Sequence, residues 1–137
     1  MSLAERPRPQ ADRDSAPWWE AVRRHELLVQ KCDGCGTLRF PPRAICARCR
    51  SRESTWTPVS GTGRVASWIV NHQIFMRAFA DEVPYAVLHV RLDDADDLFM
   101  YGDLTGADPA DVTPGMPVQA VFTDVDEDLT LVRWRPR

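Results

Sequence analysis

Four cysteines arranged as two Cys-x-x-Cys pairs constrain the fold of this chain more than any other feature. Cys32 and Cys35 form the first pair, Cys46 and Cys49 form the second, and ten residues separate the pairs. A Cys-x-x-Cys turn directs two sulfur atoms to one point, so two such turns supply the four thiolates of a tetrahedral zinc site. Because sulfur fills all four coordination positions, we expect one structural zinc ion with no open position for chemistry.

Two disulfides or a redox-active dithiol are the alternative interpretations of these cysteines. Disulfides need an oxidising compartment, and the sequence shows no secretory signal. A redox-active Cys-x-x-Cys is usually a single pair at the start of a helix, whereas this chain has two pairs at the spacing of a zinc ribbon. The motif therefore indicates a metal site strongly, but it does not indicate an activity.

The composition is that of a small folded protein with a polar N-terminal segment. The 137 residues fit one average domain or two very small ones, and the hydrophobic fraction of 44% supports a folded core. Residues 1–15 are rich in charge and proline, so we predict a flexible tail there. The longest uncharged stretch, residues 65–76, has twelve residues, whereas a membrane helix needs about 20. We expect a soluble, cytoplasmic protein that does not enter a membrane.

Charge is divided unevenly along the chain, although the net charge is only −3. Residues 31–52 carry six lysine and arginine side chains and one acid, whereas residues 80–130 carry thirteen acids and one arginine. The basic segment coincides with the cysteine pairs, so it could meet a phosphate group or an acidic partner surface. Ordinary solvated charge is the alternative, because segments of opposite charge can mix in space.

The first part of the chain, residues 16–57, is predicted to be a short helix followed by the zinc ribbon. Apolar spacing and Pro17 in the first turn indicate a helix over residues 16–24. Residues 26–31 lead into the first cysteine pair as a strand, and residues 37–40 leave it as the return strand. Pro41 and Pro42 then end this ladder, because neither residue can donate a backbone hydrogen bond.

The second part, residues 58–137, is predicted to be a five-stranded barrel. Residues 85–92 alternate between apolar and more polar side chains, as expected for a half-buried strand. The other strands are predicted at residues 64–75, 98–101, 115–125 and 129–134, with one helical turn at residues 108–111. Five strands with a long first strand fit an OB-type barrel, whereas a sandwich needs more. The predicted fold class is mainly β, an N-terminal helix plus a rubredoxin-like zinc ribbon followed by a five-stranded OB-type barrel.

Several motifs together resemble those of the zinc-ribbon/OB-fold family that is associated with acyl-CoA enzymes. Four of them flank the cysteine pairs, namely Pro17-Trp-Trp-Glu20, Leu28-Val-Gln-Lys-Cys32, Phe40-Pro-Pro-Arg43 and Val59-Ser-Gly-Thr-Gly63. Two more lie further along the chain, namely Gly115-Met-Pro-Val118 and Val132-Arg-Trp-Arg-Pro136. Each motif alone is weak, but together they cover residues 18–136 and are specific. The chain departs from the family at His25, where relatives often have a glycine.

The resemblance implies an accessory role in a hetero-oligomer. Family members accompany thiolase-superfamily proteins and other enzymes that act on acyl-CoA thioesters. The expected partner is a thiolase or a thiolase-fold aldolase, with degradation of a steroid or lipid side chain as the implied context. A contribution of this chain to acyl-CoA binding is part of the same expectation. The partner would supply the catalytic groups.

Six residues on the ribbon side are the predicted binding residues for a ligand or a partner, namely Trp18, Trp19, Arg39, Phe40, Arg43 and Arg48. Arginine offers paired hydrogen bonds to phosphate, which suits the phosphates of coenzyme A. An exposed tryptophan on the helix would suit an interface. The alternatives are that the arginines are solvated or meet an acidic partner, and that both tryptophans pack against the ribbon.

We predict no catalytic residue. His25, His72 and His89 are the only histidines, and the sequence contains no nucleophile elbow, phosphate loop or dinucleotide motif. A histidine without a paired carboxylate gives no argument for acid–base catalysis. Nucleic-acid binding is the alternative function, because zinc ribbons and OB folds both serve it, but the acids of the second part would repel phosphate.

Overall fold

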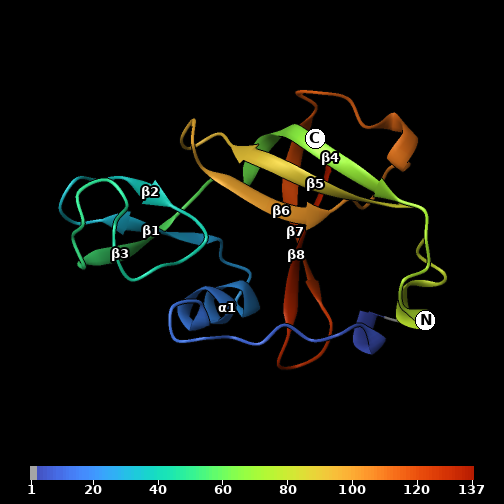
Figure 1. Cartoon of the computed structure of the whole chain (residues 1–137), viewed down its shortest axis with the longest axis horizontal. Helices are drawn as coiled ribbons and strands as arrows, with labels where there is room; N and C mark the ends of the chain where they lie inside the picture. Colours follow the sequence, from blue (N-terminus) through green and yellow to red (C-terminus); the bar gives the residue numbers. More distant parts are fainter. Residues whose placement is uncertain (1–2) are drawn as a thin grey trace.

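The computed structural model describes residues 3–137 and shows a zinc ribbon beside a β-barrel (Figure 1). The ribbon is a three-stranded antiparallel sheet in the order β2-β1-β3. Its strands are β1 (Leu28–Cys32), β2 (Leu38–Arg39) and β3 (Ser54–Pro58). Within the described residues, no helix is long and apolar enough to cross a membrane.

Helix α1 (Ala16–Arg23) precedes the ribbon and ends one residue before its predicted end. Trp18, Ala21 and Val22 are its buried residues, as the apolar spacing predicted. The helix contacts both β1 of the ribbon and β8 of the barrel. Figure 1 shows it beneath the junction of these two parts, so α1 bridges the ribbon and the barrel.

The two predicted ribbon strands are confirmed, but the third strand was not predicted. Strand β3 pairs with the whole of β1, from Leu28 opposite Pro58 to Cys32 opposite Ser54. Its sequence is mostly serine and threonine, and its side chains are half-buried or exposed. Because the strand lacks a clear apolar alternation, the sequence pattern gave no signal for it.

The barrel is a five-stranded antiparallel sheet in the order β6-β5-β4-β7-β8. Its strands are β4 (Thr62–Asn71), β5 (Tyr85–Leu92), β6 (Phe99–Asp103), β7 (Pro117–Asp124) and β8 (Thr130–Pro136). The start of β4 pairs with β7 on one side and with β5 on the other. A bulge at Ala66 separates the paired residues Val65 and Ser67, and such a bulge bends a strand around a barrel. A bridge between Leu104 and Trp134 joins the two edge strands and closes the sheet.

The barrel strands confirm the predicted OB-type fold, with one difference in length. Strand β5 has the predicted bounds, and its Ala86, Leu88, Val90 and Leu92 face the core. The one-turn helix η3 (Pro109–Asp111) also lies where it was predicted. Strand β4, however, ends at Asn71 and does not continue to residue 75. Residues 72–76 leave the sheet as a loop, and the 3₁₀ helix η2 (Arg77–Phe79) follows.

Trp134 of β8 occupies the centre of the barrel core. Its side chain is fully buried, and it packs in one cluster with Leu88, Met100 and Val118. Gly102 of β6 makes room for it, because a Cβ atom at Gly102 would lie only 2.6 Å from Cδ1 of Trp134. The same cluster includes residues of α1 and β1, so the barrel and the ribbon share one core.

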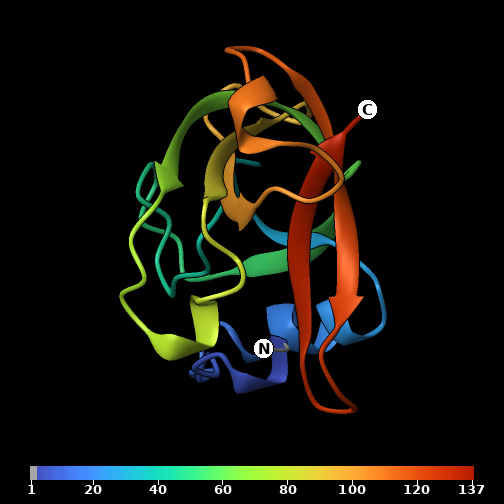
Figure 2. The same ribbon diagram turned by 90° about the vertical axis from the view of Figure 1, so that its right-hand side faces the viewer.

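The segment predicted as a flexible tail lies along the barrel, beginning with the 3₁₀ helix η1 (Leu3–Glu5). Arg6 lies 3.6 Å from the carboxylates of both Glu82 and Asp103, and its guanidinium stacks over the ring of Phe79. Arg8 forms an ion pair of 2.7 Å with Asp126. Figures 1 and 2 both show the start of the chain beside the segment between β4 and β5. The flexibility of residues 1–15 stays a prediction.

Candidate metal centre and the pocket beside it

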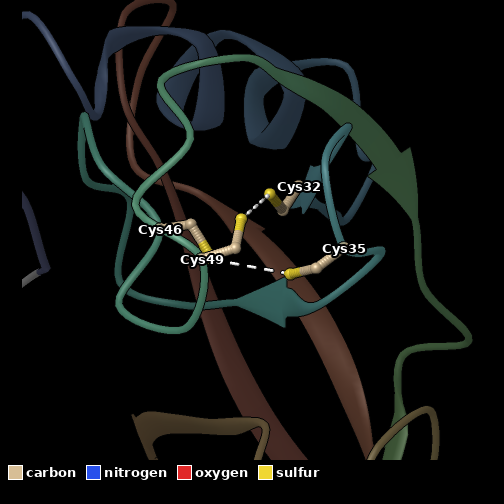
Figure 3. Close-up of side chains that lie close together, drawn as sticks. All are labelled: Cys32, Cys35, Cys46 and Cys49. Carbon is tan, nitrogen blue, oxygen red and sulfur yellow. Dashed lines mark hydrogen bonds between the residues drawn. The ribbon is translucent and has the colours of Figure 1, made fainter.

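The four cysteine sulfurs of the ribbon meet around one point. Cys32 ends β1, Cys35 lies in the turn before β2, and Cys46 and Cys49 lie in the loop between β2 and β3. All four Sγ atoms lie within 4.8 Å of one another. Figure 3 shows the two turns directing their sulfurs into one space, with Cys32 3.4 Å from Cys49 and Cys35 3.7 Å from Cys46.

These distances fit a zinc ion and exclude disulfides. Four thiolates about 2.3 Å from one tetrahedral ion lie roughly 3.8 Å from each other. A disulfide would need sulfurs about 2.05 Å apart, and all four cysteines are free thiols. The donor set is therefore that of a closed structural site, and the cluster binds one zinc ion.

The two cysteine turns have the same backbone hydrogen bonds. In the first turn, Gly36 N–H donates to Cys32 O, and in the second Arg50 N–H donates to Cys46 O. The donor residue has a positive φ in both turns, 76° at Gly36 and 64° at Arg50. A glycine adopts this conformation without a steric cost, whereas Arg50 adopts it because the turn requires it.

Backbone N–H groups also favour the thiolate form of the cysteines. Hydrogen bonds from the N–H groups of Cys49 and Arg48 lower the pKa of Cys46 to about 6. The hydroxyl and the N–H of Thr37 lower the pKa of Cys35. For Cys49, the N–H of Ser51 lowers the pKa, but the crowded sulfurs and burial raise it to about 11. A bound metal ion offsets the unfavourable interaction between the four sulfurs, because its positive charge stabilises the thiolate form of all of them.

A pocket of about 210 Å³ lies beside the metal centre, between the ribbon and the barrel. Phe40, Arg43 and Arg48 line it from the ribbon, and Asp97 of the turn between β5 and β6 lines it from the barrel. Arg39 also lines this pocket, so four of the predicted binding residues meet around one space. Asp97 was not predicted, because nothing in its sequence context shows that this turn reaches the ribbon.

Trp18, Trp19 and Arg39 are largely occupied by packing, although Arg39 also lines the pocket. Trp18 is 9% exposed and contacts the rings of Trp19 and Phe40, and Trp19 packs against the same core. Arg39 is 7% exposed, and it donates hydrogen bonds to Oε1 of Gln30 and to O of Arg43. Arg39 thus holds the backbone that carries Arg43 at the pocket. A binding role for these residues stays a prediction.

The three histidines lie apart from one another and from the cysteines. His25 follows α1, and its Nε2 lies 2.8 Å from Asp124, with Phe122 stacked on the ring. His89 of β5 is stacked between Phe99 and Tyr101. His72 is exposed in the loop after β4. The described residues do not bring any histidine to the metal centre.

The ribbon, the four-sulfur centre and the barrel together define a class of protein, a rubredoxin-like zinc ribbon joined to an OB fold. Residues 19–55 match the family described as ChsH2, rubredoxin-like zinc ribbon domain. Residues 56–123 match the family described as ChsH2, C-terminal OB-fold domain. The chain belongs to this ChsH2-type family, whose members are also described as DUF35 proteins.

Curated relatives come from bacteria and archaea. The chain is 40% identical over 133 residues to a "Probable enoyl-CoA hydratase alpha subunit" of Thermomonospora curvata, a match that covers 97% of this chain and 40% of that protein. It is 33% identical over 112 residues to a "DUF35 domain-containing scaffold protein" of Methanocaldococcus jannaschii, which covers 81% of this chain and 77% of the relative. The chain therefore spans less than half of the hydratase subunit but most of the scaffold protein.

A solved structure shares the whole architecture. A chain of the "Ltp2-ChsH2(DUF35) aldolase" superposes with a TM-score of 0.85 at 38% sequence identity. The superposition covers 94% of this chain and 98% of that chain. The resemblance stated from the sequence motifs is thus confirmed at the level of the family and the fold.

Proposed function

We propose that this chain is a non-catalytic accessory subunit of a thiolase-like enzyme, a thiolase or a thiolase-fold aldolase, that acts on acyl-CoA thioesters. The observation that carries the proposal is the match to nearly all of one chain of an aldolase complex. Steroid or lipid side-chain degradation is the proposed context. The four free thiols of a zinc centre suit the reducing conditions of the cytoplasm, where we place the protein.

The zinc centre supports a structural rather than a catalytic role. Catalytic zinc sites keep one position for water or substrate, whereas four cysteines close the coordination sphere. The centre also joins the loop between β2 and β3 to β1. The free energy of zinc binding therefore stabilises the folded ribbon. In the proposed complex it would stabilise the surface that this subunit presents.

The histidines also support a non-catalytic role. His89 Nδ1 lies 3.5 Å from Ser67 Oγ, which is beyond the reach of an activated nucleophile. No carboxylate orients the His89 ring among the described contacts, since Phe99 and Tyr101 cover its two faces. His25 does pair with Asp124, but the third group there, the Thr130 hydroxyl, donates to the carboxylate and not to the imidazole.

The pocket beside the metal centre is the proposed contact with coenzyme A. Arg43 and Arg48 line one space together with the ring of Phe40. Guanidinium groups bind phosphate oxygens in pairs of hydrogen bonds, and an aromatic ring offers a face for adenine. The volume of about 210 Å³ holds a part of the cofactor.

Activity measurements on the chain with and without its partner test the proposal. The chain is co-expressed with the genes that neighbour its own, and the thiolase-type protein that elutes with it is identified and purified. We expect the chain alone to turn over no acyl-CoA thioester and to raise the activity or the soluble yield of that protein. Turnover by the isolated chain that is lost in His89→Ala would contradict the proposal. So would a thiolase-type protein whose activity and soluble yield do not change when the chain is present.

A further inference from the structure

Most exposed large apolar side chains among the described residues lie in β4, the loop after it and β6. Six large apolar side chains are exposed in the described chain, namely Ile45, Ile69, Ile74, Phe75, Met76 and Tyr101. Five of them belong to β4, to the loop that follows it and to β6, and only Ile45 lies in the ribbon. The exposed fractions reach 65% at Ile69, 73% at Phe75 and 71% at Tyr101. Monomeric proteins rarely concentrate such side chains without a function.

Strand register places Ile69 and Tyr101 on the same outer face of the sheet. Ile69 is opposite Val87, and two residues further along β5, His89 is opposite Tyr101. The neighbouring residues Ala86, Leu88 and Val90 face the core, so residues 87 and 89 face outward. The ring of His89 stacks on both Phe99 and Tyr101 at centroid distances of 4.6 and 4.5 Å, which makes this face rigid and aromatic.

The loop after β4 adds further exposed apolar side chains beside the end of this strand. Residues 72–76 continue directly from β4, and Ile74, Phe75 and Met76 are exposed there. Figure 1 shows this loop at the end of the barrel that lies away from the zinc ribbon. We call the surface formed by Ile69, residues 72–76, Val87, His89, Phe99 and Tyr101 the outer barrel face.

Two arginines give this face an unbalanced positive charge at one end. Arg64 of β4 and Arg91 of β5 are directly opposite each other and exposed. Like charges opposite each other in a sheet are destabilising, and neither arginine forms an ion pair within residues 3–137. The carboxylate of Asp103, at the other end, is already held by Arg6 and by Arg133, the latter at 3.0 Å.

We propose that the outer barrel face is the docking surface for the thiolase-like catalytic subunit. The proposal rests on the proposed function and names the surface that serves it. The partner's surface is expected to be apolar at its centre and to carry acidic side chains opposite Arg64 and Arg91. Aromatic residues, methionine and arginine are the residues enriched in protein interfaces, and this face presents all three kinds. The similar chain in the solved aldolase is itself part of a two-protein assembly.

A protein partner fits this face better than a nucleic acid. Single strands bind where aromatic rings and cations alternate along a groove. Here the stack of Phe99, His89 and Tyr101 is flanked by the aliphatic residues Ile69 and Val87, which offer no ring for a base. Aliphatic area is buried well by another protein, and the two arginines need only a few acids to pair with them.

Binding of surface variants to the purified thiolase-type protein tests the inference. Tyr101→Ser, Phe75→Ser and Ile69→Ser each remove an exposed apolar side chain, so the fold should persist, which circular dichroism and thermal unfolding verify. We expect each to weaken binding at least about tenfold in titration calorimetry. Ile45→Ser, the matched exposed residue of the ribbon, is expected to change binding by less than about threefold.

Charge reversal tests the complementarity separately. Arg91→Glu should weaken binding about tenfold or more and reduce its salt dependence, whereas Arg13→Glu in the exposed N-terminal segment, with the same charge change, should not. If the wild-type chain binds no thiolase-type protein, the proposed function fails. If the wild type binds and the outer-face variants bind equally well, the docking surface is wrong. Binding of a labelled single-stranded oligonucleotide that Tyr101→Ser abolishes would also overturn it.

Discussion

At the scale of single residues, His25 shows how side-chain contacts stabilise an unfavourable backbone conformation. Its φ of 60° lies in the left-handed region that glycine adopts most easily, directly after the last turn of α1. Glycine is the residue that this backbone conformation favours, so a histidine here carries a steric cost. Its ring hydrogen-bonds to Asp124 and stacks on Phe122 at 5.2 Å, which ties the end of α1 to β7. The His25 ring, followed by the Thr130 hydroxyl, lowers the pKa of Asp124.

The two contributions at His25 can be separated by two substitutions. His25→Ala removes the ring contacts but keeps a side chain in the left-handed conformation, whereas His25→Gly removes the ring contacts and the steric cost together. The glycine variant is therefore expected to be more stable than the alanine variant by about 1 kcal/mol, with both of them lacking the tie to Asp124. Urea unfolding at neutral pH measures the difference. Equal stability of the two variants would show that the turn relaxes.

At the scale of elements, the sequence predicted strands with one face in the core more accurately than strands that are only partly buried. Strand β5 has one face in the core, so its alternation predicted the correct bounds. Strand β3 has only half-buried and exposed residues and gave no comparable signal. Strand β4 was predicted too long, because Ile74 and Phe75 are as apolar as core residues but lie exposed in a loop. An exposed apolar residue cannot be told from a core residue by its hydrophobicity alone.

The ribbon is the element that depends most on the metal. Cys35→Ser removes one of four thiolates and is expected to release the single zinc ion, because ligand loss in such a site removes much of its folding energy. Residues 26–52 should then exchange amide hydrogens faster, while β5 and β7 of the barrel stay protected. Elemental analysis and hydrogen exchange followed by mass spectrometry measure both effects. Ser51→Ala serves as a control that alters the loop between β2 and β3, beside the metal centre, without removing a ligand. Full zinc content in Cys35→Ser would contradict the assignment of four ligands.

At the scale of the whole molecule, the parts are held in position by contacts between distant segments. Helix α1 packs between the ribbon and β8, and the turn after β5 holds the linker between ribbon and barrel. In that linker, the N–H and the hydroxyl of Ser60 both donate to the Asp94 carboxylate. The sequence predicted the metal ligands because four cysteines at fixed spacing must converge. It could not predict that Asp97 would line a pocket with Arg48, since no local pattern records how two domains meet.

Substitutions in the pocket at this junction are expected to change the affinity for coenzyme A in opposite directions, depending on the charge that is removed. Arg43→Ala and Arg48→Ala each remove a cation that faces the space, and each is expected to weaken binding of free coenzyme A about tenfold. Asp97→Asn removes the one acid that lines the pocket, so it should strengthen binding, because less negative charge then faces the phosphates. Arg52→Ala is the matched control, an exposed arginine of the ribbon that does not line the pocket. Calorimetric titration of the four variants measures the affinities. If Arg52→Ala weakens binding as much as Arg48→Ala, or Asp97→Asn has no effect, coenzyme A meets the ribbon through general charge and not in this pocket.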